Sequence, residues 1–319
     1  MAPDFTSLSD TAQRISQERQ ASLPTVIKEL LHYEILLALM ESGSASDLVF
    51  QGGTALRLCY GGVRYSEDLD FAGGLAFEPC VMTPFVERMK ETLANRYDLA
   101  IEVEERLPNL ADKVPVGGWK ARIRLPQVER SARNSYFINI EVAKVPAYSS
   151  EILPLRTLSG SAPYAYRSVL LKAESKEEIL ADKIIALGAR PYIKYRDVWD
   201  LHMLAQEGVL INNDLVHRKV KDYGLESTHF IHDLETRIAH LSDSAAERAF
   251  QKEMLRFLEG PHQVLIGDGR NVHQMLTVAA RVGEKALDLF ASTDPSLPGG
   301  LDAKHDAIRQ PSRSQGHRP

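Results

Sequence analysis

The chain has 319 residues, of which 44% are hydrophobic and 25% are charged, and its formal net charge is −5 at pH 7. These values are ordinary for a soluble globular protein with more than one packed unit, and they exclude a uniformly basic coat for nucleic acid, so any RNA contact must be local. The two cysteines lack the spacing of a metal site, and no apolar run reaches membrane-spanning length. We therefore expect a cytoplasmic protein with no membrane partner.

The N-terminal part predicts two helices followed by a strand. Residues 7–22 form a short polar helix pattern, and residues 24–40 carry apolar side chains at helical spacing. Residues 48–51 are suited to a strand that leads into a Gly-Gly pair, and residues 55–60 begin the next helix. The predicted order is strand, glycine turn and helix.

The glycine turn is a candidate phosphate site. Gly52 and Gly53 let the backbone approach a ligand closely, and Thr54 offers a hydroxyl and an N–H where a helix dipole favours anions. A lone Gly-Gly-Thr sequence is more often an ordinary tight turn. The turn alone therefore does not establish a nucleotide site.

An acidic strand comes ten residues later. In the run from Arg64 to Phe71, Asp68 and Asp70 project from one face of a strand while Leu69 and Phe71 pack beneath the sheet. Two such carboxylates suit Mg²⁺, which takes its remaining ligands from water and from substrate phosphates. A lone Asp-x-Asp is commonly a solvated edge or loop, but together the two segments predict a site for a Mg-bound nucleoside triphosphate.

The next segment predicts a helix at residues 84–97 and strands at residues 99–107, 119–125 and 137–143. In the last of these strands three apolar residues alternate with Asn139 and Glu141, so Glu141 lies on the polar face of the sheet. It is either an acid beside the Asp68 strand or an ordinary exposed glutamate.

A basic stripe lies on the strand at residues 119–125. Its members on one face are Lys120, Arg122 and Arg124, and Arg130 and Arg133 come soon after. This stripe is a candidate for phosphate contacts, and the alternative is a solvated sheet edge that is protected by charge.

The C-terminal half predicts helices. Residues 146–163 are rich in Ser and Pro and suggest a connection between lobes, residues 175–293 are helical in pattern, and residues 294–319 are expected to be disordered. Lys183 borders an apolar helix stripe, where a lysine commonly extends into solvent. Asp197 and Asp200 open a later helix, in which Asp197 is also a candidate cap.

The order of these motifs resembles the AbiEii/AbiGii group of nucleotidyltransferase toxins, in the polymerase-beta-like superfamily. The resemblance covers residues 26–204 and rests on Gly52-Gly53-Thr54, Arg64-x-Ser66-x-Asp68-x-Asp70-Phe71, Glu178 to Lys183, and Arg196-Asp197-x-x-Asp200-Leu201. It implies an α+β fold: a polymerase-beta-like core with a mixed sheet flanked by helices in residues 1–150, and a C-terminal helical lobe completing the active site in residues 151–293, before the tail.

The resemblance also implies roles for the motif residues. Asp68 and Asp70 would hold Mg²⁺, Lys183 would neutralise triphosphate charge, and Glu141 would be the third acid. One of Asp197 and Asp200 would act in the site. Gly52, Gly53 and Thr54 would hold the phosphates of the NTP co-substrate. Arg64 and Ser66 would either buttress the acid pair or touch the phosphates.

The activity that the resemblance implies is transfer of a nucleotide from an NTP to RNA, which in the best understood members is the tRNA 3′ end. A cognate antitoxin encoded nearby would restrain the toxin. Two alternatives stay open: transfer to a protein hydroxyl, and a nucleotide-binding module without catalysis. The joint presence of Asp68, Asp70 and Lys183 speaks against a decayed site.

Overall fold

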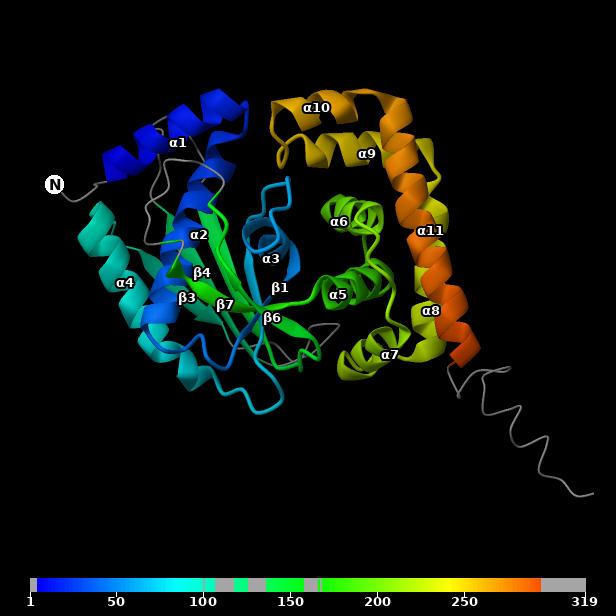
Figure 1. Ribbon diagram of the computed structural model, residues 1–319, viewed down its shortest axis with the longest axis horizontal. Coiled ribbons are helices and arrows are strands. Elements are labelled where there is room, and N and C mark those ends of the chain that lie inside the picture. Colours follow the sequence, from blue (N-terminus) through cyan, green and yellow to red (C-terminus); the bar gives the residue numbers. More distant parts are fainter. Residues whose placement is uncertain are drawn as a thin grey trace, which may run out of the picture.

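The computed structural model describes residues 5–99, 101–106, 118–125, 136–157, 166 and 168–293, and it shows an α+β fold. A mixed seven-stranded sheet is flanked by α1, α2 and α4, while α5 to α11 form a helical lobe beyond α3 (Figure 1). The fold class expected from the sequence is confirmed.

The helices are α1 (Phe5–Arg19), α2 (Leu23–Glu41), α3 (Gly52–Leu58), α4 (Thr83–Tyr97), α5 (Lys176–Ala189), α6 (Tyr195–Gln206), α7 (Asn213–Asp222), α8 (Ser227–Leu241), α9 (Ser244–Met254), α10 (Gly260–Gly267) and α11 (Gly269–Thr293), with a short 3₁₀ helix at Pro79–Met82. The strands are β1 (Val49–Gln51), β2 (Leu69–Ala72), β3 (Glu102–Arg106), β4 (Gly118–Leu125), β5 (Tyr136–Ala143), β6 (Ser150–Pro154) and β7 (Leu170–Glu174).

The acidic strand lies in the middle of the sheet, whose strand order is β3-β4-β5-β2-β1-β7-β6. β2 runs parallel to β5 and antiparallel to β1, and β1 runs parallel to β7. Because β1 leads directly into the glycine turn, the sheet places this turn, the acidic strand and the Glu141 strand next to one another.

One face of the sheet is apolar, as the alternation in β5 predicts. Ile138, Ile140 and Val142 are fully buried, and Trp119 of β4 meets Phe85 of α4 edge to face, with ring centroids 6.4 Å apart. The opposite, polar face is therefore left for the site. Helix α2 matches the predicted extent, but it is buried around most of its circumference because both α1 and α4 pack on it.

Two strands and one helix of the chain were not predicted from the sequence. β6 and β7 belong to the sheet, so the expected helical segment at residues 151–293 begins with sheet and turns helical only at Lys176. β6 is an exposed edge strand and β7 has five residues, so neither shows a clear alternation. The helical pattern expected over residues 175–293 is interrupted after Met254, where α9 ends and the separate helix α10 follows.

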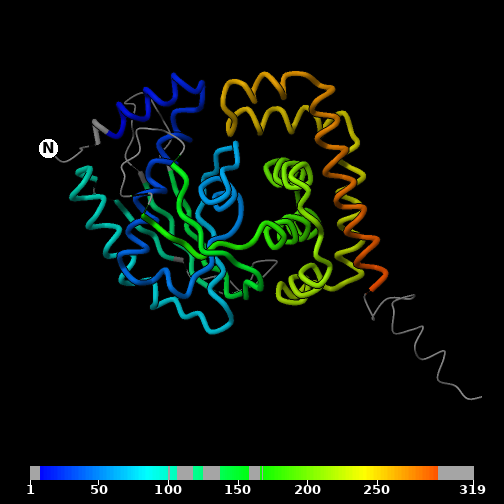
Figure 2. Tube along the Cα trace, viewed as in Figure 1, coloured from blue at the N-terminus to red at the C-terminus, as the bar shows by residue number. Residues whose placement is uncertain are grey.

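The helical lobe is joined to the sheet domain at more than one place. α5 packs against α6, α7 and α8, and α11 runs along the outer side of the lobe against α6, α8 and α9. Figure 2 shows the chain returning to the N-terminal helices between α9 and α10, where Arg19 Nη1 lies 2.8 Å from Glu259 Oε1. No helix within the described ranges is both long and apolar enough to cross a membrane. The tail at residues 294–319 lies outside the described residues.

Candidate active site

The two acids of the Asp-x-Asp motif stand at the start of β2 on the polar face of the sheet. In the strand register Asp70 lies between Gln51 of β1 and Glu141 of β5. Asn139 Nδ2 donates to Asp68 Oδ1 at 2.8 Å, so the Asp68 carboxylate has a fixed orientation. The predicted neighbourhood of Asp68, Asp70 and Glu141 is confirmed as geometry.

The glycine turn is the first turn of α3, three residues earlier than the sequence suggested. Gly52 has φ +76°, which favours glycine, and a Cβ there would lie 3.2 Å from Asp70 Oδ2. A Cβ at Gly53 would overlap the Arg64 guanidinium. Gly52 thus lets the turn reach the acid, whereas Gly53 makes room for an arginine.

The Thr54 side chain is engaged in a hydrogen bond within the protein. Its side chain is buried, and its hydroxyl donates to the Asp68 carbonyl oxygen. The hydroxyl that was expected to meet phosphate therefore ties α3 to the acidic strand. The backbone N–H groups of the first turn of α3 have no carbonyl partner within the helix, so they keep the capacity to bind an anion.

Lys183 is held in the interior and does not extend into solvent. Lys183 is 8% exposed, and its Nζ lies 2.6 Å from Asp197 Oδ1 and 2.9 Å from Asp200 Oδ2. Burial alone lowers the pKa of Lys183, but these two carboxylates raise it above its ordinary value, so the amine is charged. Burial alone would raise the pKa of Asp197, but the charges of Lys183 and Arg190 hold it well below its ordinary value.

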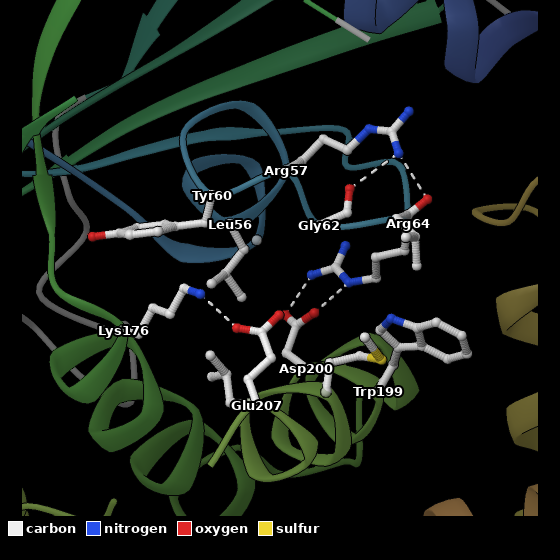
Figure 3. A pocket seen from close by; sticks show the side chains of 13 residues that line it. Leu56, Arg57, Tyr60, Gly62, Arg64, Lys176, Trp199, Asp200 and Glu207 are labelled. Carbon is white, nitrogen blue, oxygen red and sulfur yellow. Dashed lines mark hydrogen bonds and ion pairs between the residues drawn. The ribbon is translucent and has the colours of Figure 1, made fainter. Parts of the chain in front are cut away.

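Arg64 and Asp200 form a buried pair between the glycine turn and α6. Nε and Nη2 of Arg64 donate to the two carboxylate oxygens of Asp200 at 2.6 and 2.5 Å (Figure 3). Nη1 donates to the Tyr65 carbonyl oxygen. All three guanidinium nitrogens are therefore engaged within the protein. This geometry favours a supporting role for Arg64 within the protein over contact with the phosphates. Ser66 is also buried.

A cavity of about 380 Å³ opens between the polar face of the sheet and α5. Polar and charged side chains from both lobes line it. Those from the sheet are Gln51, Asp70, Lys120 and Glu141, and those from the helices are Asp182, Lys183, Arg190, Asp197 and Tyr223. Gly52 also lines it, so the cavity brings together the glycine turn, one motif acid and the Lys183–Asp197 pair.

The acids of the cavity suit a cation. Burial, together with the charges of Asp68 and Glu141, raises the pKa of Asp70 from 3.8 to about 7, so these carboxylates repel one another. Among the described residues no three metal-ligating side chains converge on one point. This arrangement fits Mg²⁺, which is commonly held by one or two carboxylates and completes its shell with water and phosphate oxygens.

The raised pKa of Asp70 gives a pH prediction. Because the folded protein favours the protonated carboxyl, the contribution of Asp70 to stability is complete below about pH 4 and is lost as the pH rises through about 7. In EDTA, the Tm of Asp70→Asn should therefore fall less between pH 5 and pH 8 than that of the wild type, by a few degrees. Mg²⁺ should reduce this difference at pH 8. Parallel pH profiles for the two proteins would contradict the assignment.

The basic stripe lies on the polar face, and β4 is an inner strand rather than an edge. Lys120 Nζ is 3.4 Å from Glu141 Oε2 and lines the cavity. Arg122 Nε donates to Asn139 Oδ1 at 3.4 Å, and Arg124 lies 3.6 Å from Glu102. The interpretation of the stripe as a charged edge is therefore wrong, and only its first member reaches the cavity. Arg130 and Arg133 lie outside the described residues.

Two residues of the cavity carried no recognisable signal in the sequence. Arg190 ends α5 and pairs with Asp197, and Tyr223 ends α7 opposite Asp70. Arg190 lies seven residues before Asp197, a spacing that predicts no contact until the intervening loop is known. Tyr223 belongs to a helix outside the motif region.

Comparison with known proteins identifies the family. Residues 34–274 match the model of the nucleotidyl transferase AbiEii toxin family of type IV toxin–antitoxin systems. The chain belongs to this family. Because the match spans most of the sheet domain and most of the helical lobe, it includes the glycine turn, the acid pair and the Lys183 helix.

Solved structures extend the comparison to the fold. MenT4, a nucleotidyltransferase toxin from Mycobacterium tuberculosis H37Rv, is similar with a TM-score of 0.50 and 20% identity, over 88% of this chain and 98% of that one. JHP933 from Helicobacter pylori is 20% identical with a TM-score of 0.43, over 91% and 100% of the two chains. No curated protein is detectably similar. The chain is thus a nucleotidyltransferase toxin of a type IV toxin–antitoxin system by its family, and the fold of MenT4 agrees.

Proposed function

We propose that this AbiEii-family toxin transfers a nucleoside monophosphate from an NTP to the 3′ end of an RNA, with tRNA as the preferred acceptor. The observation that carries the proposal is the cavity in which Gly52 and Asp70 from the sheet domain face Lys183 and Asp197 from the helical lobe. Family membership supplies the reaction class, and the cavity supplies a place for a nucleotide.

The reaction would proceed by displacement at the α-phosphorus. The acceptor hydroxyl forms a bond to this phosphorus, the bond to the pyrophosphate oxygen breaks, and the hydroxyl proton passes to a base, for which Glu141 is the available candidate beside Asp70. Mg²⁺, held by Asp68 and Asp70, would supply Lewis-acid stabilisation of the phosphate charge. Glu141 is 45% exposed in its side chain, which leaves it accessible to an incoming group.

The remaining residues would bind and orient the triphosphate. The first-turn N–H groups of α3, beginning at Gly52, would receive its distal phosphates. Lys183 would offset the charge that develops on the leaving pyrophosphate, a task that suits a compact cation fixed between two carboxylates. Asp197, which lines the cavity, would position Lys183 from one side. Asp200, which is paired with Arg64, would position Lys183 from the other side.

The natural restraint on such an activity is an antitoxin. The family belongs to type IV toxin–antitoxin systems. We infer a cognate antitoxin protein for this chain as well.

Labelled NTPs test the reaction and its acceptor together. Purified protein would be incubated with each NTP labelled on the α-phosphate, with Mg²⁺, and with either total tRNA or a protein extract. We expect label on tRNA and its loss in Lys183→Met, which removes the charged amine and keeps an unbranched side chain of nearly the same length. Label on protein would instead support nucleotidylation of protein, and no label on either would support a nucleotide-binding module.

A further inference from the structure

Lys194 is a cation without an anionic partner beside the acid pair. It lies in the loop between α5 and α6, is partly buried, and forms no ion pair within the part of the chain that the structure describes. Burial and the neighbouring charges of Arg190 and Arg196 lower its pKa, while Asp197 and Asp68 act in the opposite direction. Lys194 directly precedes α6, the helix that carries Asp197 and Asp200, and lies two residues before Arg196.

The position of Lys194 is unfavourable for the helix that it precedes. Lys194 is the N-cap residue of α6, its side chain makes no cap hydrogen bond, and Arg196 lies in the first turn. Cations at a helix N-terminus oppose the helix dipole, which favours negative charge there. These two cations therefore do not stabilise α6 through its dipole.

Three further cations surround one carboxylate next to Asp68. Glu67 Oε1 lies 2.8 Å from Lys28 Nζ and 3.6 Å from Arg256 Nη2, and Glu67 Oε2 lies 3.5 Å from Arg196 Nη1. Arg196 also pairs with Glu253 at 3.5 Å. Lys28, Lys194, Arg196 and Arg256, which we call the basic rim, thus carry four positive charges against two carboxylates.

The chemistry of the basic rim matches a single-stranded nucleic acid. The side chain of Arg256 is 67% exposed, and the guanidinium groups of Arg196 and Arg256 lie 4.6 and 5.4 Å from the ring centroid of Phe257. Proteins that hold single strands bind the phosphate backbone with such cations. The acceptor RNA of the proposed function carries such a backbone.

We propose that the basic rim holds the phosphate backbone of the acceptor RNA strand on the Asp68 side of the acid pair, with Lys194 and Arg256 as its accessible contacts. The triphosphate would occupy the cavity on the Asp70 side, so the two substrates would approach the acids from opposite sides. This inference rests on the proposed function for its acceptor, and it adds the location and the contact residues. Its residues bind the substrate strand and are not proposed to take part in bond making.

The test separates binding of RNA from chemistry. Binding of fluorescent total tRNA would be measured by anisotropy over a range of salt concentrations for the wild type, Lys194→Ala, Arg256→Ala and the double variant. The control is Arg270→Glu, because Arg270 is 92% exposed on α11 and pairs with Asp268. In the double variant we expect roughly tenfold weaker binding, and a salt slope smaller by about 1.4 in log–log units, the value for two lost contacts to a single strand. Lys194→Arg should restore binding.

The possible results distinguish failure of this inference from failure of the proposed function. If the double variant incorporates label into tRNA with an unchanged KM for tRNA, the inference is wrong although the proposed function stands. A raised KM for NTP with an unchanged KM for tRNA would indicate that Lys194 binds the triphosphate, and this result would also overturn the inference. If the wild type binds no tRNA at low salt and labels only protein, the RNA acceptor itself is wrong. A Tm of Lys194→Ala well below that of the wild type would indicate a structural role and contradict the inference.

Discussion

Replacement of Asp70 by asparagine is expected to reduce nucleotide incorporation by roughly 10³-fold or more, the range observed when one group that stabilises a transferring phosphate is removed. Asp70 lies between the glycine turn and Glu141 and lines the cavity. Asparagine keeps the shape of the side chain and removes the charge. Incorporation of α-labelled nucleotide into tRNA at saturating Mg²⁺ measures the effect.

The same substitution should leave the fold intact. Because the pKa of Asp70 is raised to about 7 by burial and by its acidic neighbours, a neutral amide removes repulsion, and the Tm at pH 8 without metal should rise or stay unchanged. Asp68→Asn should lose a similar amount of activity. A matched control is Asp222→Asn, since Asp222 precedes Tyr223 but does not itself line the cavity, and its carboxylate accepts a hydrogen bond from the Tyr148 hydroxyl. Full incorporation by Asp70→Asn would refute the metal assignment.

The acid pair and its sheet neighbours could be predicted because their signal is local. In β2 and β5 the polar residues alternate with fully buried apolar ones, and a period of two fixes which side chains share a face. The register that sets Asp70 opposite Glu141 depends on the order of strands in the fold, which the motif order suggested. Here sequence and structure agree.

The partners of the buried charges could not be predicted because they depend on contacts between distant segments. Arg64 and Asp200 are 136 residues apart, and nothing in either segment specifies a bidentate pair. The same holds for the Thr54 hydroxyl, which bonds a carbonyl oxygen that any residue at position 68 would offer. Lys183 was placed correctly on its helix, but its contact with both aspartates required the packing of α5 on α6.

Glu174 illustrates a charge cluster that sequence patterns do not reveal. Lys219 Nζ lies 2.8 to 3.1 Å from Glu178, Glu174 and Asp182, and all of these except Asp182 are fully buried. Burial and the neighbouring Asp182 raise the pKa of Glu174 well above its ordinary value. One oxygen each of Glu174 and Asp182 is buried without a hydrogen-bond partner among the described residues. This cluster fixes β7, α5 and α7 behind the cavity.

The choice between Asp197 and Asp200, which the sequence left open, leads to the second prediction of large effect. Asp200→Ala should destabilise the protein by about 3–5 kcal/mol, the usual cost of removing one partner from a buried ion pair. Asp200 accepts two hydrogen bonds from Arg64 and lies 2.9 Å from Lys183 Nζ, so its loss leaves two buried cations undercompensated. Urea unfolding followed by circular dichroism measures the change.

Asp197→Ala is the matched comparison, and it should show the opposite balance. Lys183 keeps Asp200 as a partner, and Arg190 is 37% exposed in its side chain and can be hydrated, so the loss of stability should be smaller than in Asp200→Ala. Because Asp197 lines the cavity and makes the shorter contact with Lys183, incorporation should fall strongly in a protein that is still folded. Equal destabilisation by the two substitutions, or full activity of Asp197→Ala, would contradict this division of roles between the two aspartates.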